Sequence, residues 1–214
     1  KEMIDIHNHV LFAVDDGSES FEESIEMLRE YKRNGVEIVV FTPHLNHPMF
    51  KNDVETIRKN YDILNEECKK MGIYALLGSE VYLTPKIKDV IPINDRFVLV
   101  EVNVSTYPMY LYDKVFDLQL EGYDVILAHV ERYAWLKSDA GILKKLKDMN
   151  VYFQMNVNSV KDDKFFLKNG YIDFLATDYH GKKRGTVDWE VFKTHKEIFE
   201  KTVKMLGLKV PLQQ

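Results

Sequence analysis

The feature that most constrains the fold of this chain is a regular alternation of short apolar runs with longer amphipathic stretches. The apolar runs predict strands over Met3–Ile6, Glu37–Phe41, Tyr74–Leu77, Arg96–Val100, Asp124–Ala128, Val151–Met155 and Ile172–Ala176. Helical spacing of apolar residues predicts helices over Phe21–Asn34, Asp53–Met71, Met109–Leu120, Ala140–Met149, Asp162–Lys168 and Val187–Leu206. Alternation of this kind predicts a parallel sheet with helices packed outside it.

Two α/β architectures fit this alternation: an open doubly wound sheet and a closed barrel. The sequence contains no glycine-rich phosphate loop of the GxGxxG or GxxxxGK[ST] type, which doubly wound nucleotide-binding proteins use. It also contains no linker, internal repeat or low-complexity segment. We therefore expect residues 1–214 to form a single domain.

Composition excludes several other classes of protein. A single cysteine cannot form an internal disulfide or a four-thiolate metal site. No apolar run approaches the roughly 20 residues of a membrane helix, and the N-terminus lacks the apolar core of a signal peptide. The net charge of −5 argues against nucleic-acid binding. We expect a soluble cytoplasmic protein without membrane insertion.

Side chains that can bind metals follow almost every predicted strand. They are five histidines and four carboxylates: His7, His9, Asp16, His44, Glu80, Glu101, His129, Asp178 and His180. The sixth strand is the exception, because it ends near Asn156. In an α/β barrel the carboxyl ends of the strands meet on one face. The spacing of His7 and His9, and of Asp178 and His180, lets both members of each pair point the same way.

This set of side chains predicts a site with more than one metal ion. Imidazole and carboxylate ligands without sulfur suit Mn²⁺, Fe²⁺ or Zn²⁺. Nine ligands are too many for one ion and suit two or three. Three divalent ions would outweigh four carboxylates and leave a positive pocket that attracts an anion such as phosphate. A single histidine at a strand end is more often structural, but five of the seven histidines in this position favour the metal site.

The remaining histidines and two arginines have weaker assignments. We expect His47 to be exposed to solvent near the mouth of the pocket, and His195 to be a structural residue in the middle of a helix. Arg132 follows His129 and is expected to bind phosphate, because a guanidinium matches a phosphoryl group. For Arg184, phosphate binding and solvation are equally open; the neighbouring Lys182 and Lys183 are expected to be solvated.

Six ordered motifs resemble those of the polymerase-and-histidinol-phosphatase (PHP) superfamily. They are His7-x-His9, Asp15-Asp16-Gly17, Thr42-Pro43-His44, Gly78-Ser79-Glu80-Val81-Tyr82, His129-x-Glu131-Arg132-Tyr133 and Thr177-Asp178-x-His180. The order is most similar to that of bacterial protein-tyrosine phosphatases from capsule and exopolysaccharide loci. The segment after His9, the lysine-rich loop after His180 and a short C-terminus depart from the pattern.

The resemblance implies a fold, an activity and a set of roles. The implied fold is a distorted (β/α)₇ TIM-like barrel that binds three Mn²⁺ ions. The implied activity is hydrolysis of phosphotyrosine, notably in the tail of a partner tyrosine kinase. The resemblance is also compatible with an oligomer. One ion would bind His7, His9, Glu80 and Asp178. Glu80 would bridge to a second ion held by Glu101 and His129. Asp16, His44 and His180 would bind the third, and Arg132 would bind the phosphate.

The mechanism expected from these residues is metal-assisted hydrolysis of a phosphomonoester by a hydroxide held between the metals. A cysteine-dependent phosphatase needs Arg six positions after the nucleophile, and Tyr74 stands six positions after Cys68. Two other functions stay open: a small-molecule phosphatase of the histidinol-phosphate type, and a non-catalytic metal-dependent binding module. The acidic charge disfavours a nuclease.

Overall fold

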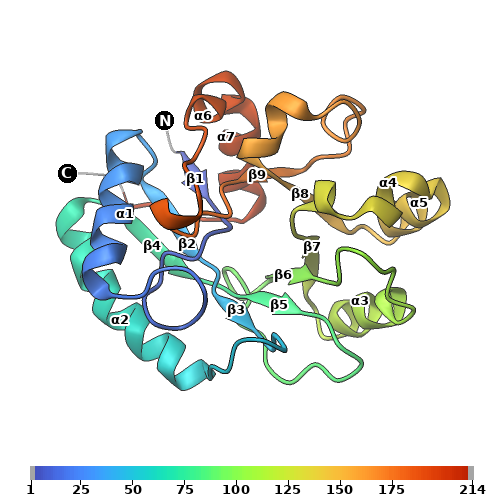
Figure 1. Cartoon of the computed structure of the whole chain (residues 1–214), viewed down its shortest axis with the longest axis horizontal. Helices are drawn as coiled ribbons and strands as arrows, with labels where there is room; N and C mark the ends of the chain where they lie inside the picture. Colours follow the sequence, from blue (N-terminus) through green and yellow to red (C-terminus); the bar gives the residue numbers. More distant parts are fainter. Residues whose placement is uncertain (1–2, 212–214) are drawn as a thin grey trace.

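The computed structural model describes residues 3–211, and its strands form two parallel sheets (Figure 1). Within these residues nine strands are present: β1 (Ile4–Asp5), β2 (Ile38–Phe41), β3 (His44–Leu45), β4 (Tyr74–Leu77), β5 (Glu80–Tyr82), β6 (Phe97–Glu101), β7 (Asp124–Leu127), β8 (Tyr152–Asn156) and β9 (Phe174–Ala176). Their order is β1-β2-β4 in one sheet and β3-β5-β6-β7-β8-β9 in the other. Each predicted apolar run overlaps one strand, which confirms an α/β fold with a parallel sheet.

The strand count exceeds the seven predicted runs because β3 and β5 are short additional strands. Pro43 lacks a backbone N–H, so it separates β2 from β3. Gly78 separates β4 from β5 at a point where a Cβ would lie 2.6 Å from the Ile93 side chain. Across both interruptions the backbones stay paired, since Gly78 N donates to Phe41 O at 2.8 Å and Glu80 N to Pro43 O at 2.9 Å.

The curled sheets bring the last strand back to the first. Asp178 N donates to His7 O at 2.7 Å, and His9 N donates to Tyr179 O at 2.8 Å. Below these bonds the buried Asp5 carboxylate accepts from Thr177 N at 2.8 Å. The residues just beyond β1 and β9 are therefore neighbours, although about 170 positions separate them along the chain.

The helices surround the curled sheets (Figure 1). Within residues 3–211 the α-helices are α1 (Phe21–Arg33), α2 (Val54–Met71), α3 (Leu111–Leu120), α4 (Ala134–Ser138), α5 (Ala140–Asp148), α6 (Glu190–Thr194) and α7 (Lys196–Met205). The Ser20 side chain accepts from Glu23 N at the start of α1, and Gly72 ends α2 with a φ of 71°. Both predicted helix boundaries are thus confirmed.

Two predicted helices are wrong in part. Asp162–Lys168 is a series of turns, because the Asp163 carboxylate accepts backbone N–H groups from Phe166 and Leu167 at 3.0 Å. The predicted helix over Val187–Leu206 is broken between α6 and α7. His195 lies at this break and not in the middle of a helix, and its φ of −126° is outside the helical range.

The hydrophobic core has two layers, one inside the curled sheets and one between the sheets and the helices. The strands are apolar on both faces because each face packs against one of these layers. Ile38, Val40 and Leu99 pack inside the curled sheets, whereas their strand neighbours Val39 and Val98 pack beneath the helices. No helix within the described chain, residues 3–211, is long and apolar enough to cross a membrane.

Candidate metal centre

The ends of the strands bring all nine predicted ligands into one cluster, in which six are buried and Asp16, Asp178 and His180 are partly buried. Four groups of ligand atoms lie close enough to share an ion: His7, His9, Glu80 and Asp178; His9, Asp16, His44 and His180; Glu80, Glu101 and His129; and His44, His47 and Glu101. Glu80 belongs to the first and third of these groups and His9 to the first and second, so the groups adjoin one another.

In the first group two imidazoles face the same two carboxylate oxygens. Nε2 of His7 lies 3.2 Å from both Glu80 Oε1 and Asp178 Oδ1, and Nε2 of His9 lies 3.2 and 3.3 Å from the same two atoms. Ligands about 2.1 Å from one ion lie roughly 3.0–3.4 Å apart in octahedral or tetrahedral geometry. The spacing of these four atoms therefore fits a shared ion.

Several of these atoms are buried without a hydrogen-bond partner among the described residues. Those beside other ligand atoms are Nε2 of His7 and His9, Nδ1 of His44, and one oxygen each of Asp16 and Glu80. Nδ1 of His129 is also without a partner, whereas Nε2 of this ring faces Glu80 and Glu101. Buried polar atoms are normally hydrogen-bonded, and leaving one without a partner is costly. The residues present thus fit a group of metal ions in both donor chemistry and spacing.

Residues behind the ligands hold the imidazole rings in place. Asp15 accepts from His9 Nδ1 at 2.7 Å, and Gln154 accepts from His7 Nδ1 at 2.8 Å. A bond at Nδ1 leaves the Nε2 lone pair facing the cluster. The main chain of Asp178 accepts from His180 Nδ1 at 2.8 Å in the same way.

The mutual approach of imidazoles and carboxylates shifts their pKa values strongly. Burial acts to lower the pKa of His129, but hydrogen bonds with Glu101 and Glu80 outweigh burial and raise this pKa to about 10. Burial also acts to lower the pKa of His44, but the Glu80 charge together with hydrogen bonds to Asp16 and Glu101 raises this pKa to about 10. Burial acts to raise the pKa of Glu80, but His7 and His44 lower it well below its usual value.

Arg132 and Arg184 line the same cavity, whose volume is about 460 Å³. Both side chains are about half exposed. Nη1 of Arg132 lies 3.9 Å from Asp178 Oδ2, and Arg184 forms an ion pair with Asp16. Lys183, expected to be solvated, donates instead to Gly17 O and Glu19.

Sequence reasoning missed four residues at this site. His47, expected to be exposed, is only 15% exposed and lies 3.3 Å from Glu101 Oε1. Asp15 and Gln154 orient histidines, and Asn156 donates to Asp178 Oδ2 at 3.0 Å. The one signal of these roles in the sequence was the polar Gln154 inside an apolar run.

Cys68 is buried in α2, where burial raises its pKa to about 12, so it is a packing residue.

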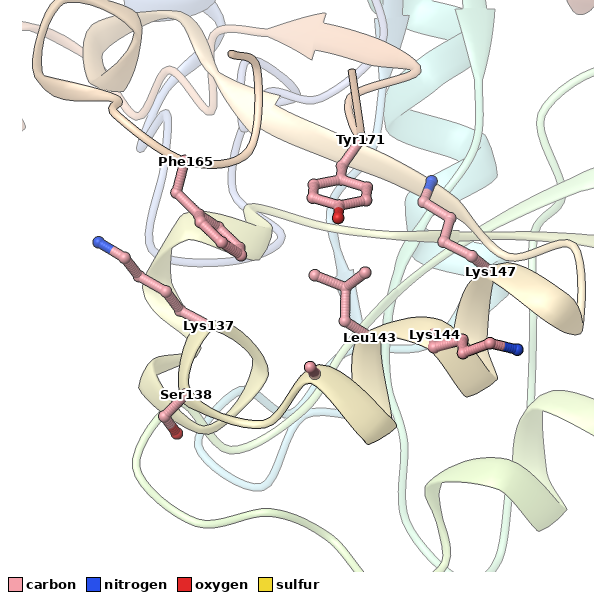
Figure 2. Close-up of a pocket in the computed structure, with 8 residues that line it drawn as sticks. Lys137, Ser138, Leu143, Lys144, Lys147, Phe165 and Tyr171 are labelled. Carbon is pink, nitrogen blue, oxygen red and sulfur yellow. The ribbon is translucent and has the colours of Figure 1, made fainter. Parts of the chain in front are cut away.

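A second hollow, of about 510 Å³, lies between α4, α5 and the turns around Phe165 and is not lined by any predicted ligand. Figure 2 shows Leu143, Phe165 and Tyr171 facing a common space, while the ends of Lys137 and Lys144 point away from it. The groups of side chains that could hold a metal ion, within the described residues, lie in the cavity at the strand ends and not in this hollow.

Comparison with known proteins adds to this geometry. A family model described as capsular polysaccharide synthesis, CpsB/CapC, matches residues 3–206. The tyrosine-protein phosphatase CpsB of Streptococcus agalactiae is 30% identical over 201 residues, covering 83% of each chain. The putative tyrosine-protein phosphatase CapC of Staphylococcus aureus is 33% identical over 196 residues, covering 83% of this chain and 77% of CapC.

A solved structure gives the same result. It is described as YwqE from Bacillus subtilis and CpsB from Streptococcus pneumoniae, unique metal-dependent tyrosine phosphatases. It superposes with a TM-score of 0.81 and 28% identity, covering 96% of this chain and 91% of the other. Relatives in both sequence and structure are thus named tyrosine phosphatases.

Proposed function

Because this chain belongs to the CpsB/CapC family of capsular polysaccharide synthesis, we propose that it is a metal-dependent phosphatase that hydrolyses phosphotyrosine in proteins. The observation that carries the proposal is the buried cluster of imidazoles and carboxylates beside two half-exposed arginines. The names of the relatives support the same reaction.

We propose that the nine clustered residues hold three ions. His7, His9, Glu80 and Asp178 would hold the first, and Glu80 would be shared with a second held by Glu101 and His129. Asp16, His44 and His180 would hold the third. The short distances between ligand atoms within each group support this division. Bound divalent ions supply a nucleophilic water at neutral pH and positive charge for phosphoryl oxygens. Manganese is the expected metal, with iron(II) or zinc as alternatives.

The chain's own residues bind and orient the phosphate. Arg132 reaches into the cavity from the turn after β7 and would donate to phosphoryl oxygens. Arg184 would contribute a second donor if its ion pair with Asp16 exchanges for the phosphate. Gln154 and Asp15 keep the histidines in one orientation, so the site needs little rearrangement to bind substrate.

The finer features of fold and partner are also proposals. Counting β2–β3 and β4–β5 as single interrupted strands would give a distorted (β/α)₇ barrel, and the bridge between Asn8 and Tyr179 supports closure. One family model over residues 3–206 supports a single domain. We propose the tail of a bacterial tyrosine kinase as the phosphotyrosine substrate; cytoplasmic location and an oligomer stay predictions.

Metal removal tests the proposed function. EDTA should abolish hydrolysis of a phosphotyrosyl peptide, and Mn²⁺ should restore it. His9→Ala should lose metal, measured by elemental analysis, together with turnover. Arg132→Ala should keep its metal but lose about 100-fold or more in kcat/KM, because removing one donor to the reacting phosphoryl group is costly. Full activity of the metal-free protein, or faster hydrolysis of histidinol phosphate than of the peptide, would contradict the proposal.

A further inference from the structure

One side of the metal cavity differs in chemistry from the cluster of ligands. It is lined by the turn from His47 to Phe50, by the last residue of β5 and by residues that follow β6, namely His47, Pro48, Met49, Phe50, Tyr82, Val102, Asn103 and Val104. Apart from His47, which lies beside Glu101, none of these side chains carries a formal charge at pH 7. The cavity therefore joins an ionic floor to a largely apolar wall.

The turn that forms this wall is held in place from both ends. Asn46 donates to the backbone of Tyr82 at 3.1 Å, and Asn52 donates to the backbone of Val14 and His44 at 3.0 and 2.6 Å. These bonds tie the segment between β3 and α2 to strand ends that carry predicted ligands. The wall thus has a defined position over the cluster.

Two large apolar side chains of the turn lie outside the hydrophobic core. Met49 is 79% exposed, and neither Met49 nor Phe50 belongs to the hydrophobic core of the described residues. The Phe50 ring instead stacks on His44, with centroids 5.0 Å apart, and contacts His47 at 4.7 Å. Apolar side chains exposed in a binding cavity indicate a surface for an apolar group of the ligand.

The distance between this wall and the cluster suits an aryl phosphate. In phosphotyrosine a single oxygen joins the phenyl ring to the phosphorus, so the ring lies directly beside the phosphate and must be bound next to the metal cluster. Phe50 lies next to the cluster, because its ring is in contact with the predicted ligand His44. A phosphoserine would place polar peptide backbone against the same apolar wall, where its N–H and C=O groups would lose hydrogen bonds with water.

We propose that Met49 and Phe50 contact the phenyl ring of the substrate and thereby select phosphotyrosine over phosphoserine. This inference rests on the proposed phosphatase activity and adds its specificity-determining residues. A flexible thioether adapts to an aromatic ring edge, and aromatic pairs favour stacked or edge-on contact. The side chains act on the binding of the ring and take no part in proton transfer.

The test compares two peptides of the same sequence that carry either phosphotyrosine or phosphoserine, with manganese-loaded protein. Met49→Ala and Phe50→Leu should each lower kcat/KM for the phosphotyrosyl peptide by about tenfold, mainly through a higher KM. Hydrolysis of the phosphoseryl peptide should be slow and unchanged. Met109→Ala is a matched control, since Met109 is 85% exposed and lies outside the cavity.

The metal content of each variant is measured as well, because Phe50 could act by contacting the substrate or by holding the predicted ligand His44 in place. An equal loss on both peptides, or a loss of metal in Phe50→Leu together with normal selectivity in Met49→Ala, would overturn the inference. Unchanged selectivity in both variants would overturn it while leaving the phosphatase activity established. Hydrolysis of neither peptide by the loaded wild-type protein would overturn the proposed function, and this inference with it.

Discussion

The orientation of each predicted ligand depends on the residues that surround it as well as on its own side chain. Gln154 is fully buried and accepts from both His7 Nδ1 and His129 N at 2.8 Å. Two of the predicted ligands also have backbones in the left-handed region, with a φ of 35° at His129 and 53° at Asp178. Backbone strain of this kind persists where surrounding contacts over-determine it, and it is common at functional sites.

Replacing Gln154 tests this support. Gln154→Leu should weaken Mn²⁺ binding by about 10–100-fold, because it removes the acceptor that orients His7. It should also lower the free energy of unfolding by about 1–3 kcal/mol, since the N–H of His129 would be buried without a partner. Competition with a chelator measures the affinity.

Gln119→Leu is the matched control, because Gln119 donates to the backbone of Met149 outside the metal cavity. Gln154→Glu keeps an acceptor for His7 and should bind metal better than Gln154→Leu. Equal metal affinity in Gln154→Leu and Gln119→Leu would show that Gln154 does not position the ligands.

Strands β1 and β9 meet through a buried network centred on Asp5. Its carboxylate accepts from Thr177 N and Thr177 Oγ1, from Tyr31 OH at 2.6 Å, and from Asn8 Nδ2 at 3.2 Å. Thr177 precedes Asp178, and Asn8 lies between His7 and His9. A single side chain therefore holds together the strand ends that carry four predicted ligands.

Asp5→Ala should destabilise the metal-free protein by about 3 kcal/mol or more, because it leaves several buried donors without an acceptor. Tyr31→Phe removes one of these bonds and should cost about 1 kcal/mol. Denaturation by urea measures both values. A loss in Asp5→Ala no larger than that in Tyr31→Phe would contradict a central role for the Asp5 carboxylate.

The sequence was sufficient to predict the strands, most of the helices and the ligand types. It was not sufficient to predict features that depend on contacts between segments far apart along the chain. Apolar runs predicted the strands because both faces of the sheet are buried. The break at His195 was missed because the apolar periodicity continues across it. The role of Gln154 was missed because its partners His7 and His129 lie 147 and 25 positions away. His47 looked exposed because its loop gives no sign of folding back over the cavity.

Across the whole molecule, the strand ends concentrate opposite charges at one buried place. Among the predicted ligands, six are buried: His7, His9, His44, Glu80, Glu101 and His129. Without metal, protonated histidines balance the carboxylates, which is why their pKa values move in opposite directions. Metal ions would take over this balance, so metal binding, protonation and folding are coupled.

This coupling predicts that the stability of the metal-free protein falls as the pH rises and that the stability of the metal-loaded protein does not. In the metal-free protein the pKa values of His44 and His129 rise from about 6.5 to about 10. Their contribution to stability is therefore complete below about pH 6.5 and is lost as the pH rises toward 10. The lowered pKa values of Glu80 and Asp178 contribute stability above about pH 4.5, which is lost as the pH falls.

The metal-free protein should consequently be most stable between about pH 4.5 and 6.5. From pH 6 to pH 9 its Tm should fall by about 4 °C or more, equivalent to a loss of about 2 kcal/mol. The Mn²⁺-loaded protein should not show this fall, because metal binding requires neutral imidazoles and strengthens as protons leave. Thermal unfolding with EDTA or with Mn²⁺ over this pH range measures both responses. A Tm of the metal-free protein that is constant or rises toward pH 9 would show that protonated histidines do not balance the carboxylates.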